Sequence, residues 1–159
     1  MTNSLSRRSL RTVGSEVFAL IASAFVYSLA FPGFINTTGF GWIAFFALIP
    51  MFMVIRNTTW KLVIPYGFFY GFVFYLFFNY WLKTFHPLAI LLVPIIKGGE
   101  MIALFPALKL SQRFFKKYSY LVDAVIYVAY TYLSTKWFAG YPSGMLGSAV
   151  YGHLELIRL

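Results

Sequence analysis

The chain contains no cysteine among its 159 residues, and only four acidic residues accompany its 13 lysines and arginines. Without cysteine it has no disulfide, no thiolate metal ligand and no thiol nucleophile. Charged residues of either sign amount to 11%, whereas they make up about a quarter of an ordinary soluble domain. Hydrophobic residues reach 60%, aromatic residues 22%, and the mean hydropathy is +0.75. This composition excludes a soluble globular domain and indicates a membrane protein.

Apolar stretches recur along the whole length, separated by short polar or turn-rich connectors. Each stretch is near the length of about 20 residues that a helix needs to cross a bilayer. We therefore predict an all-α integral membrane protein, a polytopic helix bundle of about five spans that forms one transmembrane domain and leaves no room for a soluble domain. A further apolar run near the C-terminus looks truncated before a sixth span. The expected spans cover residues 17–34, 40–55, 62–82, 88–108 and 121–138 of the domain 1–159.

The first two expected spans are the shortest. Their uninterrupted apolar runs, 17–31 and 41–55, would each cover about 22 Å as a helix, less than the roughly 30 Å of the hydrocarbon core. The connector FPGFINTTGFG between them is rich in turn-forming residues. Two arrangements follow: the pair crosses fully with the help of apolar connector residues, or it is re-entrant. The sequence leaves both open.

The basic residues are distributed unevenly between the two ends of the expected bundle. If the spans alternate in direction, only Lys83 and Lys136 fall on one side. The positive-inside rule then predicts a cytoplasmic N-terminus, and it explains the formal charge of +9 by topology rather than by binding of nucleic acid. The residues on the basic side are Arg7, Arg8, Arg11, Arg56, Lys61, Lys109, Arg113, Lys116 and Lys117.

Lys97 and Glu100 lie near the middle of the expected span 88–108, beside the glycine pair Gly98 and Gly99. An ionised side chain at the bilayer centre costs at least about 2.5 to 3.5 kcal/mol, so each charge needs a partner or a watery cavity. Residues three apart share one face of a regular helix, which favours a mutual ion pair. The double glycine also permits local unwinding around a cavity, where the charges would contact a substrate or a lipid headgroup. Both interpretations remain open.

Gly67 and Gly71 form a small-xxx-small pair within the expected span 62–82. Such a pair lets a neighbouring helix approach closely. Glycine that is merely tolerated in a membrane helix, without a partner, is an equally good interpretation.

His86 stands at a membrane boundary, in the sequence Phe85-His86-Pro87. An imidazole there can bind a phosphate, relay a proton or simply occupy the interface, and a lone histidine favours the last. His153 is far along the chain, and there is no HExxH pattern, Walker loop, GxGxxG or GxSxG. We therefore expect no metal, no cofactor, and neither nucleotide-hydrolase nor serine-hydrolase chemistry.

Three separated segments resemble the apolipoprotein N-acyltransferase family. SLAFPGFINTTGFGWIAFFALIPMF is similar to the opening of the family, with its Leu-Ala-Phe-Pro element, and GFFYGFVFYLFFNYWLKTFHPL resembles the third span. WFAGYPSGMLGSAVY is similar to a Gly-Phe/Tyr-Pro segment on the outer face, although Ser143 replaces the tryptophan that usually follows. The segments occur in the family's order and cover nearly all of the chain. Gly140, Tyr141 and Pro142, with Gly147, form the strongest match.

The resemblance implies the membrane part of an enzyme of lipoprotein maturation in the bacterial inner membrane. In the family, a cysteine thiolate takes an acyl chain from a phospholipid and passes it to the N-terminal diacylglyceryl cysteine of an apolipoprotein. The Glu-Lys-Cys triad belongs to a nitrilase-like domain that this chain lacks, so we expect no catalytic residue here and a separately encoded nitrilase-like half as a candidate partner. The candidates for contact with substrate or lipid are Gly140, Tyr141, Pro142, Gly147, His86, Lys97 and Glu100.

The alternative function is a small non-enzymatic membrane subunit or a transporter fragment. In that case Lys97, Glu100 and the interrupted span around them would form the site. The ordered match of three segments favours the acyltransferase family.

Overall fold

The computed structural model describes residues 10–33, 35–37, 39–136 and 149, and every regular element in this part of the chain is a helix. The expected all-helical membrane bundle is thereby confirmed. The α-helices are α1 (Leu10–Leu29), α2 (Ala44–Ala47), α3 (Ile49–Asn57), α4 (Trp60–Phe78), α5 (Ala89–Phe114) and α6 (Ser119–Lys136), and the short 3-10 helices are η1 (Gly41–Ile43), η2 (Tyr80–Thr84) and η3 (Lys116–Tyr118).

Three of these helices are long and apolar enough to cross a membrane, namely α1 from Arg11 onward, α4 and α5. The apolar segment Gly41–Asn57 is shorter and is divided into η1, α2 and α3. Five crossings therefore remain a prediction, and so does the choice between a full span and a re-entrant arrangement for the second segment.

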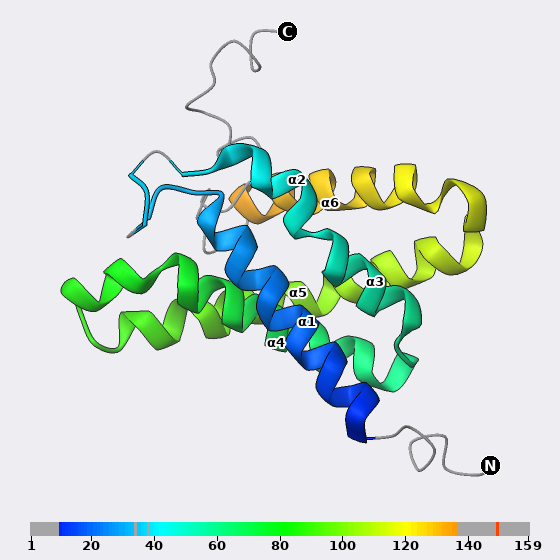
Figure 1. Cartoon of the computed structure of the whole chain (residues 1–159). Coiled ribbons are helices and arrows are strands. Elements are labelled where there is room, and N and C mark those ends of the chain that lie inside the picture. Colours follow the sequence, from blue (N-terminus) through cyan, green and yellow to red (C-terminus); the bar gives the residue numbers. More distant parts are fainter. Residues whose placement is uncertain (1–9, 34, 38, 137–148, 150–159) are drawn as a thin grey trace, which may run out of the picture.

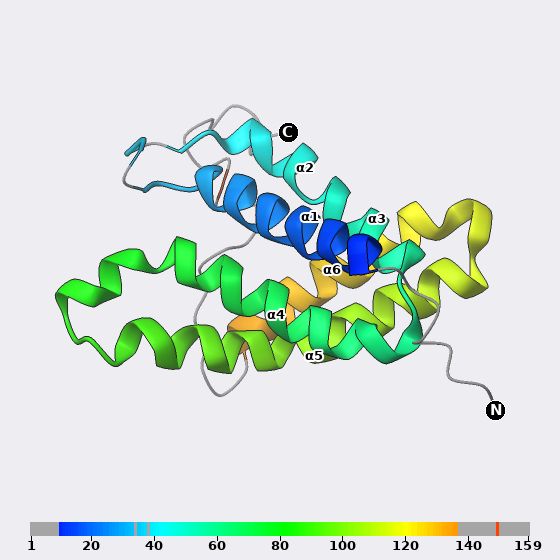
Figure 2. The same ribbon diagram turned by 60° about the horizontal axis from the view of Figure 1, so that its bottom comes forward.

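Helices α4 and α5 form an antiparallel hairpin in which their backbones touch (Figure 2). A Cβ atom at Gly67 would lie 2.7 Å from the carbonyl oxygen of Met101, and one at Gly71 would lie 2.9 Å from the Cα atom of Gly98. Neither distance leaves room for a side chain, so the contact depends on glycine on both helices. Of the two interpretations of the small-xxx-small pair, close packing against a neighbouring helix is the one that the structure shows.

Helix α1 lies along α4 and runs in the same direction (Figures 1 and 2). Near the start of α1, the Tyr66 hydroxyl donates a 2.9 Å hydrogen bond to the Glu16 carboxylate. Beyond its end, the rings of Phe31 and Phe78 meet edge to face with their centroids 5.0 Å apart. These contacts at both ends fix the register of the two helices.

The connector after α1 folds back onto the end of that helix. The amide of Phe40 donates to the carbonyl of Leu29, and Gly39 adopts a positive φ of 71°. A Cβ atom at Gly39 would lie only 2.5 Å from the carbonyl oxygen of Ala30. Only glycine fits this backbone conformation and this approach, which explains part of the turn-rich composition of the connector.

The break between α2 and α3 is stabilised by α1. Pro50 lies in the first turn of α3 and has no backbone N–H to donate. The Ser23 hydroxyl of α1 donates a 2.6 Å hydrogen bond to the carbonyl oxygen of Ala47, where α2 ends. A side chain from a neighbouring helix thus bonds the backbone at the break, as a buried membrane segment requires.

The basic end of the bundle is tied together by Lys109. Its ammonium group donates to the carbonyl oxygens of Ile55, Arg56 and Thr58, at 2.8, 2.7 and 2.9 Å. A cation at this position satisfies the carbonyl groups at the end of α3 and complements the negative end of the helix dipole. Helix α5, which supplies Lys109, continues to Phe114 and so extends past the end expected for the fourth span.

Helix α6 packs mainly against α5, and most of its side chains are at least partly exposed. The Gln112 amide donates a 3.0 Å hydrogen bond to the Asp123 carboxylate, which links the two helices. On α6, the buried residues are Asp123 and Tyr127, while Val125, Val128 and Leu133 are exposed. An apolar exposed face of this kind is suited to contact with lipid.

Candidate functional site

The charges in the middle of α5 form an ion pair inside the bundle. The Lys97 ammonium lies 3.0 Å from each of the two carboxylate oxygens of Glu100. The Lys97 side chain is 1% exposed, and that of Glu100 is 14% exposed. The mutual pairing expected from the three-residue spacing is therefore present, and α5 stays helical through Gly98 and Gly99 rather than unwinding.

The position of Lys97 follows from the glycine contact beside it. A Cβ atom at Gly98 would lie 2.9 Å from the carbonyl oxygen of Phe68, so α4 is pressed against α5 at this level. Two charges in such a place are tolerated because each one neutralises the other. Removal of either partner would leave an uncompensated charge in the bundle.

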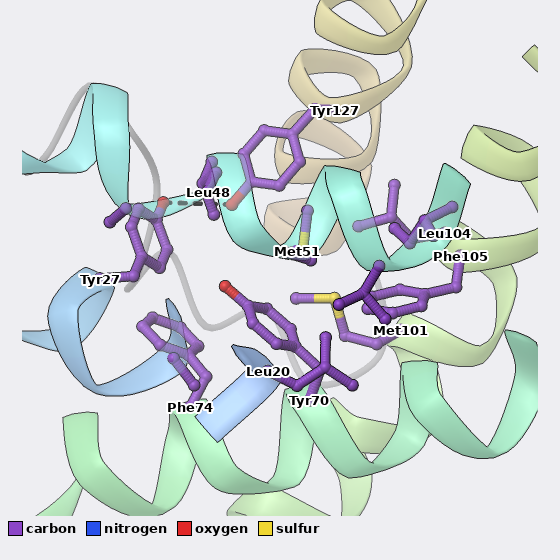
Figure 3. Packing of buried hydrophobic residues seen from close by; sticks show 14 of the residues in the cluster. Leu20, Tyr27, Leu48, Met51, Tyr70, Phe74, Met101, Leu104, Phe105 and Tyr127 are labelled. Atoms are coloured by element: carbon purple, nitrogen blue, oxygen red, sulfur yellow. Dashed lines mark hydrogen bonds between the residues drawn. The ribbon is translucent and has the colours of Figure 1, made fainter. Parts of the chain in front are cut away.

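A cluster of tyrosines occupies the interior beside this pair. The Tyr127 hydroxyl of α6 donates a 3.1 Å hydrogen bond to the Tyr27 hydroxyl of α1, and Figure 3 shows the Tyr70 hydroxyl of α4 pointing toward the same space. The Ser23 hydroxyl, which bonds the backbone of α2, lies beside that of Tyr70. We call Tyr27, Tyr70, Tyr75, Tyr127 and Tyr130 the tyrosine cluster.

Tyr130 connects the tyrosine cluster to the ion pair. It lies within electrostatic range of Tyr75 and of Glu100, and its buried hydroxyl has no hydrogen-bond partner in the described part of the chain. A buried hydroxyl without a partner leaves one hydrogen-bonding position open in the interior. The interior therefore presents a cation, an anion and an available hydroxyl where α4, α5 and α6 meet.

The chemistry that this arrangement offers is that of charged and hydroxyl hydrogen-bonding partners. Within the described residues, no three His, Cys, Asp or Glu side chains come together in a way that could hold a metal ion. Lys97 and Glu100 engage each other, and the tyrosine hydroxyls are neutral donors and acceptors. Such groups can hydrogen-bond a polar ligand or fix helix positions.

The other site candidates from the sequence lie elsewhere. His86 is exposed in the connector before α5, where its Nδ1 atom accepts a 3.2 Å hydrogen bond from the Leu88 amide. Lys97 is eight residues past the start of α5, about 12 Å along its axis, so the structure does not bring the histidine to the ion pair. Gly140, Tyr141, Pro142 and Gly147 lie outside the described residues.

Sequence reasoning missed the tyrosine cluster. Tyr127 and Tyr130 are three positions apart, so the two side chains share a helix face. That spacing was the available signal. It was obscured because aromatic residues near span ends are common as interfacial belts.

The described helices, their exposed apolar faces and the buried ion pair define a polytopic helical membrane protein with a polar interior. The family described as "Apolipoprotein N-acyltransferase N-terminal domain" matches residues 23–159. The chain belongs to this family and is a membrane domain of the N-acyltransferase type.

Curated relatives agree with this assignment. The chain is 34% identical over 139 residues to Apolipoprotein N-acyltransferase 1 of Treponema denticola. The aligned residues cover 87% of this chain and 26% of that protein. It is 30% identical over 144 residues to Apolipoprotein N-acyltransferase 1 of Treponema pallidum, covering 91% of this chain and 26% of the relative. The chain thus spans about a quarter of the length of the curated relatives it matches. No solved structure matches it.

Proposed function

We propose that this chain is the membrane domain of a protein that transfers an acyl chain from a phospholipid to the N-terminal diacylglyceryl cysteine of apolipoproteins. The match of residues 23–159 to the N-terminal domain of that enzyme family carries the proposal. The family resemblance places the nucleophile on a cysteine, and this sequence has none. Bond making then belongs to residues outside these 159, and the domain's role is to hold the lipid substrates next to them.

We further propose that the protein lies in the bacterial inner membrane with its N-terminus in the cytoplasm. The alternating direction of the helices supports this orientation, because it gathers Arg56, Lys61, Lys109 and Arg113 at one end. The opposite end carries His86. In the sequence, α6 is followed by Gly140, Tyr141, Pro142 and Gly147, which we propose as further contacts at that end. Substrates would approach from that end.

Within the bundle, we propose Lys97 and Glu100 as polar contacts for a lipid headgroup or for the ester region of a lipid substrate. The open hydroxyl position of Tyr130, within electrostatic range of Glu100, supports this role. A carboxylate that is partly exposed and already paired can accept a further hydrogen bond without losing its partner.

A chimera tests the proposal directly. Residues 1–159 would replace the matching quarter of the Treponema denticola relative in a strain depleted of its own N-acyltransferase. We expect the chimera to restore growth and N-acylation of a reporter lipoprotein, and we expect this chain alone to restore neither. Loss of rescue when the relative's nucleophilic cysteine is replaced by alanine provides the control.

Two results would contradict the proposal. A chimera that inserts into the membrane at normal abundance but does not acylate the reporter would show that the domain cannot serve this reaction. Rescue by the chain alone would show that catalysis does not need residues outside it.

A further inference from the structure

A groove with a volume of about 410 Å³ is lined by residues of α2, α3 and α6, together with Gln112 near the end of α5. Its apolar wall includes Phe45, Leu48 and Phe52, from α2, α3 and the residue between them. At the basic end of the bundle it is bounded by polar side chains instead. These are Arg56, Gln112 and Asp123.

The length of the groove matches one leaflet of a bilayer. Phe45 and Arg56 are 11 positions apart in the two consecutive helices α2 and α3, which together extend at most about 16 Å over these positions. Half of the hydrocarbon core is about 15 Å thick. An acyl chain that begins beside Arg56 would therefore reach the level of Phe45.

The polar end of the groove has hydrogen-bond acceptors that nothing in the described part of the chain satisfies. The Gln112 amide nitrogen donates to one oxygen of the Asp123 carboxylate, at 3.0 Å. The other carboxylate oxygen and the Gln112 amide oxygen have no partner among the described residues, although Asp123 is only 6% exposed. Buried acceptors of this kind call for a donor. Arg56, at the same end, supplies a guanidinium group for an anion.

We propose that this groove binds one phospholipid whose headgroup carries both a phosphate and a primary ammonium group. The ammonium donates to Asp123 and Gln112, the phosphate pairs with Arg56, and an acyl chain lies along Phe45, Leu48 and Phe52. The site does not depend on the proposed acyl transfer. It lies at the end of the bundle that Lys109 ties together, opposite the end assigned to the substrates.

Charge complementarity distinguishes this headgroup from the other common ones. A glycerol headgroup offers the phosphate that Arg56 needs but places no cation beside the Asp123 carboxylate. A choline headgroup carries a cation without any N–H, so it cannot satisfy the two free acceptors. Only a primary ammonium meets the charge and the hydrogen-bonding requirement together.

Native mass spectrometry of the purified chain, with lipids of identical acyl chains, provides the test. Phosphatidylethanolamine, phosphatidylcholine and phosphatidylglycerol would be offered in equal amounts. We expect one tightly bound phosphatidylethanolamine, preferred about tenfold over each of the others, because one charge-assisted hydrogen bond is worth about that ratio. Equal retention of the three lipids, preference for phosphatidylglycerol, or a second copy of the chain in place of lipid would overturn the proposal.

Three variants locate the lipid. Asp123→Asn should remove the preference for the ethanolamine lipid over the choline lipid. Arg56→Gln should weaken the binding of all three lipids several-fold. Because Asp123→Asn can disturb the α5–α6 contact, Ala124→Phe serves as a second test: Ala124 is exposed and lines the groove, so phenylalanine would fill it and displace the lipid.

The matched control for Ala124→Phe is Ala129→Phe, at an exposed position on the same helix outside the groove. It should bind lipid like the unmodified chain. If both phenylalanine variants keep their helix content and bind phosphatidylethanolamine equally well, the groove is not the site.

Discussion

The Lys97–Glu100 pair places two charges where the surrounding helices leave little access for water. Breaking such a pair typically costs about 3 to 5 kcal/mol, whereas replacing both partners is often close to neutral. We expect Glu100→Gln to destabilise the chain more than Lys97→Met does, because Lys97 is the more deeply buried partner. The free energy of unfolding of the double variant should lie within about 1 kcal/mol of that of the original chain. The free energy of unfolding of the two single variants and the double variant can be measured in detergent, with circular dichroism as the signal.

Lys83→Met is the control for this series, because it removes an exposed lysine from the connector between α4 and α5. It should leave stability unchanged. If the double variant were as unstable as the sum of the two singles, the charges would act separately. If it were stable but inactive in the chimera, the pair would have the proposed role in substrate contact as well.

The hydrogen bond between Tyr27 and Tyr127 is the direct polar link between α1 and α6. Tyr127→Phe removes the hydroxyl and keeps the ring, so the loss should be about 1 kcal/mol, the usual contribution of one such bond. Tyr27→Phe should cost a similar amount, and the combined variant should cost little more than either one. The measurement is again the free energy of unfolding in detergent.

Tyr132→Phe provides the comparison, since Tyr132 is exposed on the same helix as Tyr127. It should have no effect. Additive costs of Tyr27→Phe and Tyr127→Phe would contradict a direct bond between the two hydroxyls.

The α4–α5 hairpin depends on where glycine is located and not on how much glycine is present. Gly67→Ala would place a methyl group 2.7 Å from a backbone oxygen of α5, which forces the helices apart. We expect a loss of about 2 kcal/mol, as for other overpacked interiors. Gly99→Ala is the same change on the same hairpin, but a Cβ atom there meets nothing within 4 Å, so it should be neutral or slightly stabilising.

Thermal unfolding of Gly67→Ala and Gly99→Ala, compared in the same detergent, tests this expectation. Equal midpoints for the two variants would show that the helices do not approach each other as closely as the glycine positions indicate.

Hydrophobicity predicts the long helices well, because α4 and most of α5 are apolar segments that begin after polar connectors, whereas proline and glycine inside these helices do not interrupt them. Hydrophobicity predicts the second segment less well. Whether Ala47 and Pro50 interrupt a helix depends on the Ser23 hydroxyl of another helix, and no local pattern contains that information. The extension of α5 to Phe114 was also missed, since its last turns are polar but remain helical.

The same division applies to the candidate site. Three-residue spacing on one helix offered pairing of Lys97 and Glu100 as one of two interpretations, and the structure shows the pair, because helix geometry alone brings the two side chains together. The tyrosine cluster joins α1, α4 and α6, and two of its members that contact each other, Tyr27 and Tyr127, are 100 positions apart in the sequence. Such a cluster depends on tertiary packing, which sequence periodicity does not specify.

The topology of the whole chain can be tested because it contains no cysteine of its own. Single cysteines at Lys83 and Lys117 lie in connectors at the two ends of α5. We expect a membrane-impermeant thiol reagent to label Lys83→Cys in intact cells and to label Lys117→Cys only after the inner membrane is opened. The unmodified chain should take no label in either condition.

The reverse pattern would contradict the proposed orientation. Labelling of both positions from the same side would contradict a crossing by α5, the longest of the three candidate spans.

The direct contact between α4 and α5 also bears on how the bundle assembles. These helices are consecutive and are joined by a short connection, so they lose little chain entropy when they pair. Helix α1 can dock on this hairpin once α4 has entered the bilayer. Of the described helices, α6 comes last in the sequence, and the Tyr27–Tyr127 bond can form only after α6 has been synthesised. We therefore expect the described helices to assemble outward from the glycine contact, with the bond between α1 and α6 as the last of these contacts to form.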